Sequence, residues 1–441
     1  MKYKAYQLSN YSSIKGIEKL AAADRRAIEI TGQVFPFKVN NYVSEQLIDW
    51  NNIPEDPIFT LCFPRKEMLQ TDHFKQVERL MNSGAGKEEF KKAINTIRQT
   101  LNPHPAGQHL NVPQVDNIKL NGMQHKYRET VLFFPSQGQT CHSYCTFCFR
   151  WPQFSGMDGM RFAMKESNLL VKYLQQHSEV TDVLFTGGDP LTMSASHISH
   201  YVDALLNSDL HNIQTIRFGT KSFSFWPYRF LSDPDSDDLM RVFEKVVLSG
   251  INLAIMAHFS HPRELSTTAV QEAIRRVRST GAQIRTQSPI LNHINNYPSV
   301  WTEMWRKQVN LNCIPYYMFI ARDTGAKEFF EIPIADCWEV FRKAYQQVSG
   351  VCRTVRGPSM SATPGKIQIL GVSDEPGEKV FILRFLQGRN PEWVQQPFFA
   401  KYDAKATWLN TLKPAFGKQK FFFEDDLTLG NVMDEDESIY L

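Results

Sequence analysis

The sequence predicts an α/β protein whose central part is a parallel, partial (β/α)6 TIM-like barrel. Between residues 121 and 370, six short apolar runs of strand length alternate with stretches that have the 3.6-residue periodicity of helices. Glycine-containing or polar motifs directly follow these runs, as they do at the carboxyl ends of barrel strands. A doubly wound open sheet is the alternative, although the G-x-G-x-x-G dinucleotide fingerprint is missing.

Residues 1–120 are predicted to form a helical N-terminal region. The stretches from Ser13 to Ile30 and from Lys87 to Thr100 place charged and apolar residues at helical spacing. No repeated strand signal occurs among these residues. The turn-rich segment from Asn102 to Gly107, with two prolines and a glycine, is expected to end the region.

The predicted barrel covers residues 121–370 and begins with the apolar run from Val131 to Phe134. Five later runs each follow a helical pattern: Val183–Phe185, Ile213–Phe218, Leu253–Met256, Gln283–Thr286 and Cys313–Phe319. Residues 371–441 are predicted to be an extended C-terminal extension with aromatic clusters. Its acidic end, residues 434–437, is expected to be solvated.

Composition and charge are those of an ordinary globular enzyme. Hydrophobic residues make up 42% of the chain and charged residues 22%, with a net charge of +3. This balance indicates neither a nucleic acid nor a membrane as partner. The N-terminus lacks the apolar run of a signal peptide, and no stretch of about 18 apolar residues occurs. We therefore expect a cytoplasmic protein.

Three of the seven cysteines lie within eight residues, as Cys141-x3-Cys145-x2-Cys148. The other four are scattered singly, which argues against a disulfide framework and for a reducing compartment. Three thiolates at this spacing can hold an iron–sulfur cube and leave one iron open for a chelating cofactor, whereas ferredoxin-type clusters use four cysteines. The alternatives are a zinc knuckle, although zinc sites favour four ligands, or three unrelated buried thiols.

This spacing resembles the signature of the radical S-adenosylmethionine superfamily, and residues 115–370 resemble its lysine 2,3-aminomutase family. Five further segments resemble family motifs in the same order: His125-Lys126-Tyr127, Gly187-Gly188-Asp189, Ala257–Pro262, Thr286-Gln287-Ser288 and Pro315-Tyr316-Tyr317. The resemblance implies a partial barrel, a [4Fe-4S] cluster, S-adenosyl-L-methionine and pyridoxal 5′-phosphate. It implies that a 5′-deoxyadenosyl radical abstracts a hydrogen from an amino acid, whose amino group then moves from the α to the β carbon. A reductant such as flavodoxin or ferredoxin is implied as partner.

The resemblance also assigns roles to individual residues. It implies that Cys141, Cys145 and Cys148 ligate the cluster and that Arg150 pairs with the substrate α-carboxylate, a task that suits a planar guanidinium. The residues implied to bind the other cofactors are Gly187, Gly188 and Asp189 at the methionine part of S-adenosylmethionine, His258 and Gln287 at pyridoxal phosphate or the adenosyl group, and Lys126 at a phosphate.

The chain departs from the family pattern at the predicted pyridoxal phosphate site. The family's second phosphate-binding arginine falls on Thr130, which leaves Lys126 and Arg128 for this task. The glycine-rich loop whose lysine forms the Schiff base is replaced by residues 358–366, and Lys366 matches that lysine only with a three-residue insertion. An alternative is therefore an enzyme on the same scaffold that lacks pyridoxal phosphate and catalyses another hydrogen abstraction. A non-catalytic iron–sulfur protein is a third hypothesis. Structural zinc is not expected, because the last cysteine is Cys352.

The residues at two positions predict which kind of amino acid is the substrate. Lysine enzymes of the family hold the distal ammonium with two aspartates, and an ungapped alignment puts Arg322 and Arg356 there. This charge inversion predicts an acidic amino acid such as glutamate or aspartate rather than lysine. A one-residue shift would instead bring Asp323 to the first position, and both arginines could bind phosphate or solvent. The sequence leaves a homo-oligomer open.

Overall fold

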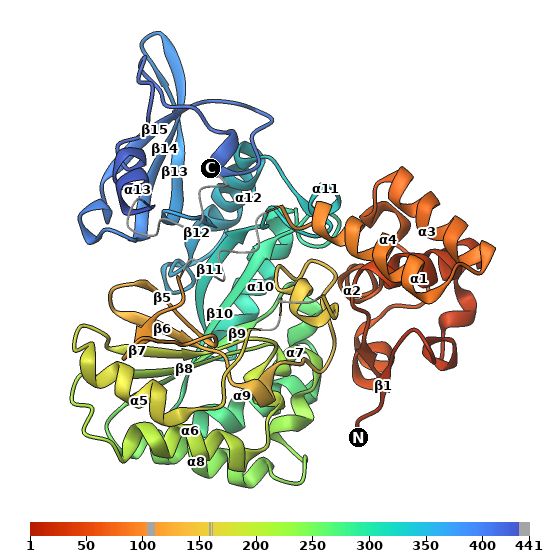
Figure 1. Cartoon of the computed structure of the whole chain (residues 1–441), viewed down its shortest axis with the longest axis horizontal. Coiled ribbons are helices and arrows are strands. Elements are labelled where there is room, and N and C mark those ends of the chain that lie inside the picture. The colour runs from red at the N-terminus through yellow and green to blue at the C-terminus, as the bar shows by residue number, and fades with distance from the viewer. Residues whose placement is uncertain (104–110, 158–159, 161, 432–441) are drawn as a thin grey trace.

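The computed structural model describes residues 1–103, 111–157, 160 and 162–431, and its centre is one 11-stranded sheet (Figure 1). Seven neighbouring strands of this sheet are parallel and lie in sequence order. They are β6 (Thr130–Phe133), β7 (Asp182–Phe185), β8 (Thr215–Thr220), β9 (Asn252–His258), β10 (Gln283–Ile290), β11 (Ile314–Ile320) and β12 (Arg356–Ser361). Strand β5 (Met123–Tyr127) pairs antiparallel with β6 at one edge.

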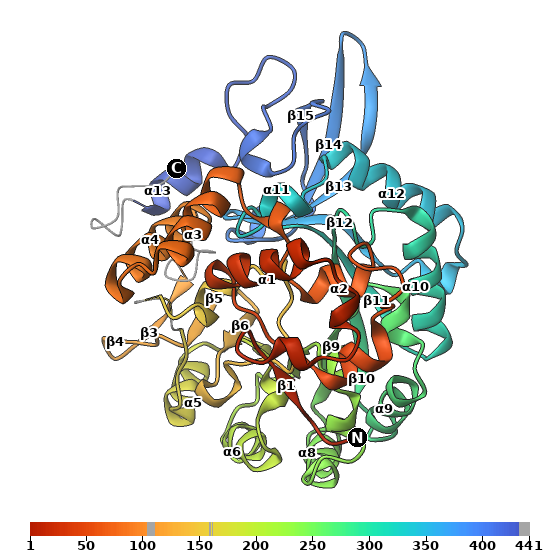
Figure 2. The ribbon, with the colours of Figure 1, turned by 90° about the vertical axis from the view of Figure 1, so that its right-hand side faces the viewer.

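A helix connects each parallel strand to the next. These helices are α5 (Ser167–Gln176), α6 (Ala195–Leu206), α8 (Ser236–Leu248), α9 (Thr268–Ser279), α10 (Pro298–Asn310) and α12 (Ile334–Gln346). Figure 2 shows them arranged around the outside of the sheet. Each helix buries one apolar stripe; in α9, for example, Val270, Ile274 and Val277 are buried at helical spacing. The Thr267 hydroxyl accepts from the Val270 N–H at 3.3 Å and caps the start of this helix.

Alternation along the strands separates an apolar face from a polar one. In β8 the side chains of Ile216 and Phe218 are buried, and the Phe218 ring packs against Phe243 of α8 at 6.0 Å. Arg217 points to the opposite face, where its Nε donates to the Asp182 carboxylate of β7 at 2.8 Å. The face of the sheet that is turned away from the helices therefore carries charged side chains.

The predicted α/β class is confirmed, and β6 to β11 overlap the six predicted strands. The sequential order also differs from a doubly wound sheet, in which the strand order reverses at a switch point. Strand β12 was not expected, because the run Arg356–Ser361 contains a glycine and a proline and lacks an apolar pattern.

The N-terminal region is mostly helical, as predicted. It contains α1 (Ala22–Val34), α2 (Pro57–Cys62), α3 (Thr71–Ser83) and α4 (Lys87–Thr100), together with the short pairs β1 (Ala5–Tyr6) with β2 (Val39–Asn40) and β3 (Gln114–Val115) with β4 (Ile118–Lys119). Helix α4 has the predicted bounds. Helix α1 starts at Ala22 rather than Ser13, because Gly16 adopts a left-handed φ of 101° and separates two short 3-10 turns before it. Residues 104–107 of the turn-rich segment lie outside the described residues.

The C-terminal part is a folded extension of the sheet rather than an extended tail. Strands β13 (Gly365–Glu375), β14 (Glu378–Gly388) and β15 (Pro397–Lys401) add to β12 as an antiparallel meander (Figure 1). The predicted boundary at residue 370 falls inside β13, and the division into domains stays a prediction. Rings from the two aromatic clusters pack together, with the Phe398 and Phe421 centroids 5.5 Å apart, before α13 (Glu424–Asn431). The acidic end lies outside the described residues.

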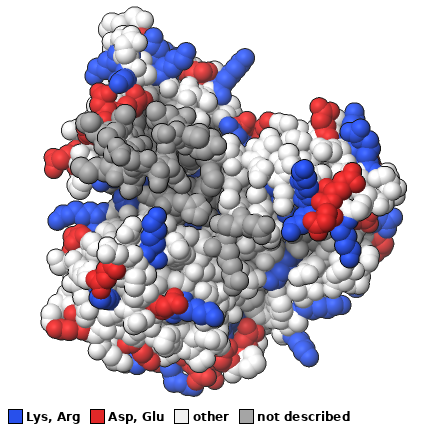
Figure 3. All heavy atoms as spheres, viewed as in Figure 1, with Lys and Arg blue, Asp and Glu red and all other residues white. Residues whose placement is uncertain are grey.

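Acidic and basic side chains are interspersed over the face that Figure 3 presents, which fits the small net charge of +3. In the described part of the chain, no helix combines the length and apolar character that a membrane crossing requires.

Candidate active site

The cysteine loop, Cys141–Cys148, follows β6 and is held by the N-terminal region. The Tyr144 N–H donates to the Lys38 carbonyl at 2.8 Å, and the Thr146 N–H donates to the Leu61 carbonyl at 2.9 Å. The Thr146 hydroxyl also donates to the Thr60 carbonyl at 2.8 Å. These contacts shape a loop that has little regular structure of its own.

The three thiols of this loop are partly buried and form no disulfide. Burial raises the pKa of each thiol, and the neighbouring thiols raise the pKa of Cys141 and Cys145 further. Thiolates would therefore need a positively charged group such as iron to be stable here. Among the residues that the structure describes, no group of three or more His, Cys, Asp or Glu side chains surrounds a single point where a metal ion could bind.

The two glycines after β7 pack directly against the segment that precedes Cys141. A Cβ atom at Gly188 would lie 2.5 Å from the Thr140 carbonyl oxygen, and one at Gly187 would lie 2.2 Å from Gln139 Nε2. Gly187 also has a φ of 133°, which other residues rarely adopt. These positions require glycine because the two loops approach each other closely. Their predicted contact with S-adenosylmethionine stays a prediction.

Asp189 connects the loops after β7 and β8. Its carboxylate is buried, with 2% of the residue exposed, and accepts hydrogen bonds from the Thr220 and Ser222 hydroxyls at 2.8 and 2.9 Å. The N–H groups of Lys221 and Leu191 also donate to it, at 2.9 and 3.0 Å. Burial raises the pKa of Asp189 and the hydrogen bonds oppose this rise. The carboxylate therefore anchors two site loops, and its predicted contact with a cofactor amine stays a prediction.

Replacing Asp189 with asparagine is expected to lower the free energy of unfolding by about 3 kcal/mol, because an amide NH2 would then face buried donors. The urea midpoint, followed by circular dichroism, measures this loss. Asp209→Asn is the matched control, since the Asp209 side chain is 82% exposed. An unchanged midpoint for Asp189→Asn would show that the carboxylate does not anchor these loops.

His258, the last residue of β9, lies beside Gln287 of β10, with which the strand register pairs it. The His258 ring stacks on Phe147 of the cysteine loop at 5.8 Å between centroids. Burial lowers the pKa of His258 well below its usual value, so the imidazole is neutral. Its Nδ1 and the Oε1 of Gln139 are buried without a hydrogen-bond partner in the described structure. Such orphaned atoms fit a site that receives a polar ligand.

Two buried guanidinium groups lie over one aromatic ring. Arg150 lies over Phe134 and Phe149, at 4.5 and 4.9 Å from their centroids, and Arg322 lies 4.9 Å from the Phe149 centroid. In the described part of the chain, neither guanidinium has an ion pair or a hydrogen bond. Burial and the charge of Arg322 lower the pKa of Arg150 to about 10. Two unpaired cations at one place favour a bound anion.

Three other cations, Arg322, Lys366 and Arg389, lie near Lys126, and we call these four residues the cationic cluster. Burial and its three cationic neighbours lower the pKa of Lys126 well below its usual value. Lys366 Nζ donates to Gln387 Oε1 at 2.9 Å and lies 4.3 Å from the Tyr317 ring centroid. Burial lowers the pKa of Lys366 to about 8. No motif in the sequence marks Arg389, which directly follows β14.

Three other candidates are Arg356, Arg128 and Thr130. Arg356 shares the Tyr317 ring with Lys366, at 5.8 and 4.3 Å from its centroid, and its charge lowers the pKa of Lys366. Arg356 is exposed at the start of β12, where it lies 4.9 Å from the Tyr316 centroid and donates to the Tyr316 and Tyr317 hydroxyls at 3.4 Å. No hydrogen bond, ion pair or shared ring joins it to Arg322 in the described structure. Arg128 pairs with the adjacent Glu129 at 3.9 Å and its side chain is 62% exposed. The Thr130 hydroxyl donates to Asp182 at 3.0 Å.

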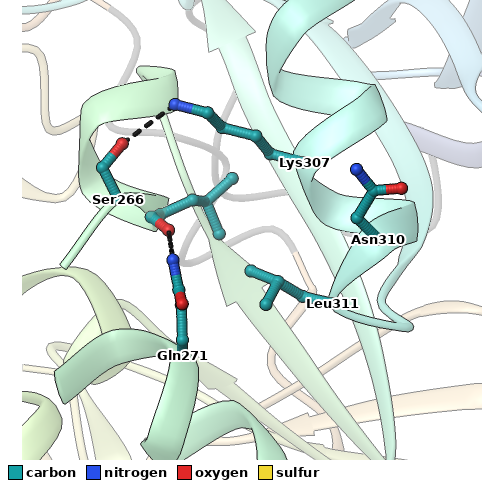
Figure 4. A pocket seen from close by; sticks show the side chains of 6 residues that line it. Ser266, Gln271, Lys307, Asn310 and Leu311 are labelled. Atoms are coloured by element: carbon teal, nitrogen blue, oxygen red, sulfur yellow. Dashed lines mark hydrogen bonds between the residues drawn. The ribbon is translucent and has the colours of Figure 1, made fainter. Parts of the chain in front are cut away.

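A surface pocket of about 380 Å³ lies elsewhere, on the helical layer around α9 and α10 (Figure 4). Lys307 Nζ donates to the Ser266 hydroxyl across it at 2.9 Å. None of the candidate site residues lines this pocket.

The cysteine loop, held beside glycine-rich and polar loops at the carboxyl ends of sequential parallel strands, defines a radical S-adenosylmethionine enzyme. A protein of Aquifex aeolicus named "Putative L-lysine 2,3-aminomutase" is 30% identical over 397 residues, which are 90% of this chain and 93% of that protein. The chain belongs to the lysine 2,3-aminomutase family.

Two further comparisons gave matches. The "Glutamate 2,3-aminomutase" of Clostridioides difficile is 25% identical over 213 residues, which cover 48% of this chain and 47% of that protein. The crystal structure of a radical SAM methyltransferase from Sphaerobacter thermophilus covers 67% of this chain and 95% of that chain, with 15% identity and a TM-score of 0.38. No protein-family model matches the chain.

Proposed function

We propose that the protein is a 2,3-aminomutase that acts on an acidic amino acid. The observation that carries this proposal is that the guanidinium groups of Arg150 and Arg322 lie over one ring, Phe149, and that neither makes a hydrogen bond or an ion pair with the described residues. An amino acid with a second carboxylate offers one anionic group to each of them, and a guanidinium binds a carboxylate through two parallel hydrogen bonds. The similarity to a protein named glutamate 2,3-aminomutase supports the same substrate class.

The proposal includes a partial barrel that surrounds the site. The sequential order of the seven parallel strands and the helices around their outside support this interpretation (Figure 2). A ligand on the inner face would contact the charged side chains that point away from the helices.

The residues fit the cofactors that the family implies. Cys141, Cys145 and Cys148 would hold the cluster, and the orphaned Gln139 Oε1 and His258 Nδ1 offer hydrogen-bonding atoms to S-adenosylmethionine. When bound, the cluster and S-adenosylmethionine supply a radical that abstracts a substrate hydrogen, and pyridoxal phosphate carries the amino group. The electron donor is proposed to be a protein such as flavodoxin or ferredoxin.

This chain's own residues orient the substrate. Arg150 would bind the α-carboxylate beside the cysteine loop, since it follows Cys148 by two residues. Arg322 would bind the distal carboxylate, and its guanidinium lies as far from the Phe149 centroid, 4.9 Å, as that of Arg150. Lys366 and Lys126 would hold pyridoxal phosphate. With a pKa of about 8, the Lys366 amine is partly neutral near neutral pH and can act as a nucleophile.

An enzyme of the same class without pyridoxal phosphate is the alternative. Thr130 favours it, because this residue replaces a phosphate-binding arginine and its hydroxyl donates to Asp182. Lys366→Ala separates the two functions, because only the aminomutase needs this residue to attach pyridoxal phosphate.

Deuterated glutamate, aspartate and lysine, each incubated with the reconstituted enzyme, test the proposal. We expect deuterium in 5′-deoxyadenosine from glutamate or aspartate, and little from lysine, because two guanidinium groups repel its distal ammonium. Arg322→Asp is expected to shift the preference towards lysine by about tenfold or more. The same change at the exposed Arg356 is expected to shift it by less than about twofold, because solvent screens that charge. A preference of the unmodified enzyme for lysine would refute the acidic substrate.

A further inference from the structure

The loop between β12 and β13 binds two cations on neighbouring carbonyl groups. Lys126 Nζ, from β5, donates to the Ala362 carbonyl, and Arg389 Nε donates to the Thr363 carbonyl at 2.9 Å. The Arg389 N–H also donates to the Pro364 carbonyl at 3.0 Å. Segments more than 200 residues apart in sequence thus place a lysine and an arginine side by side. The same loop continues into Lys366.

These two cations have no anionic partner in the described part of the chain. The Arg389 guanidinium uses only its Nε in the hydrogen bonds of this structure, so both Nη atoms remain available. The charged groups that act on Lys126 are Arg322, Arg389 and Lys366, and all three are cations. Burial of several like charges without a counter-ion is costly, and a bound dianion would offset this cost.

We propose that Arg389, in the connection between β14 and β15, is the second cation of a phosphate-binding pair whose first member is Lys126. This inference rests on the proposed function, in which pyridoxal phosphate is the ligand. A phosphate monoester carries close to two negative charges at neutral pH, which a lysine and an arginine together neutralise. The guanidinium can bind two phosphate oxygens at once.

The proposal explains how the chain replaces the arginine that is missing at Thr130. The Thr130 hydroxyl is bound to Asp182 and Arg128 is exposed, so neither supplies a second cation. The antiparallel meander returns the chain to the site instead, and Gly365 of β13 pairs with Gly388, the residue before Arg389. The C-terminal extension would therefore contribute a residue to the pyridoxal phosphate site.

Binding of pyridoxal phosphate and of pyridoxal, which lacks the phosphate, tests this role. Both ligands are titrated into purified full-length protein that has been freed of pyridoxal phosphate, and absorbance reports binding. Arg389→Gln keeps an N–H donor for the Thr363 carbonyl but removes the charge. We expect it to weaken pyridoxal phosphate binding by about tenfold or more and to change pyridoxal binding by less than about twofold. Arg241→Gln is the matched control and should change neither, because this arginine of α8 has a side chain that is 67% exposed.

The results of this titration distinguish failure of the proposed role of Arg389 from failure of the proposed function. Equal weakening of both ligands would make Arg389 a structural residue and overturn the inference, as would an unchanged affinity for pyridoxal phosphate. Failure of the unmodified protein to bind either ligand would overturn the proposed function itself. Should Arg389→Gln unfold, Arg389→Lys provides the second variant. It keeps the charge but loses the two-pronged geometry, so we expect a smaller loss that is again confined to the phosphate-bearing ligand.

Discussion

Replacement of Cys145 with alanine is expected to abolish the formation of 5′-deoxyadenosine from S-adenosylmethionine under reducing conditions. The cysteine loop offers three thiols within eight residues, and removal of one leaves two ligands for the cluster. The same loss is expected for alanine at Cys141 or Cys148. Iron content, the electron paramagnetic resonance signal of the reduced cluster and chromatography of 5′-deoxyadenosine measure the effect.

The matched control is Cys313→Ala, which removes a buried thiol that lies between α10 and β11, outside the cysteine loop. This variant should keep its iron and its ability to cleave the cofactor. A triple variant that lacks Cys141, Cys145 and Cys148 but still forms 5′-deoxyadenosine would disprove the assignment of the cluster to this loop.

Lys366→Ala is expected to eliminate covalent attachment of pyridoxal phosphate and, with it, turnover of the amino acid. The amine of Lys366 lies against Tyr317 at 4.3 Å and is held by Gln387 at 2.9 Å. Absorbance reports bound pyridoxal phosphate, and borohydride reduction followed by peptide mass spectrometry identifies the residue to which it is attached. Cleavage of S-adenosylmethionine without substrate should persist in the variant, because the cysteine loop is intact.

The pH dependence of pyridoxal phosphate attachment provides an independent test of the role of Lys366. Attachment requires the neutral amine, and burial lowers the pKa of Lys366 to about 8. The rate of attachment should therefore rise as the pH increases through about 8 and level off above it. The rate for an ordinary exposed lysine would continue to rise towards about pH 10.

Lys172→Ala is the control for Lys366, since Lys172 is half exposed and pairs with Asp116. It should leave both attachment and its pH profile unchanged. Full amino acid turnover by Lys366→Ala, or by protein that contains no pyridoxal phosphate, would establish that the enzyme works without this cofactor.

Local patterns in the sequence were sufficient to predict the central fold and the cysteine loop. The apolar runs that became β6 to β11 are recognisable because each is a short, mostly apolar stretch between helical patterns. The spacing of Cys141, Cys145 and Cys148 is likewise local, since a loop of eight residues can bring the three thiols to one cluster. The resemblance to the lysine 2,3-aminomutase family likewise rests on motifs that each span only a few residues.

The tertiary structure decided which distant side chains meet. Asp189 is adjacent to two glycines in a recognisable motif, but only the folded chain shows that it accepts hydrogen bonds from the loop after β8. Arg356 matched a substrate position by alignment, yet it is exposed on β12. Arg389 lies in no motif, and the meander places it beside the loop that binds Lys126. The physical reason is that periodicity records which face of an element is buried, whereas contacts between elements depend on long-range pairing that no local pattern encodes.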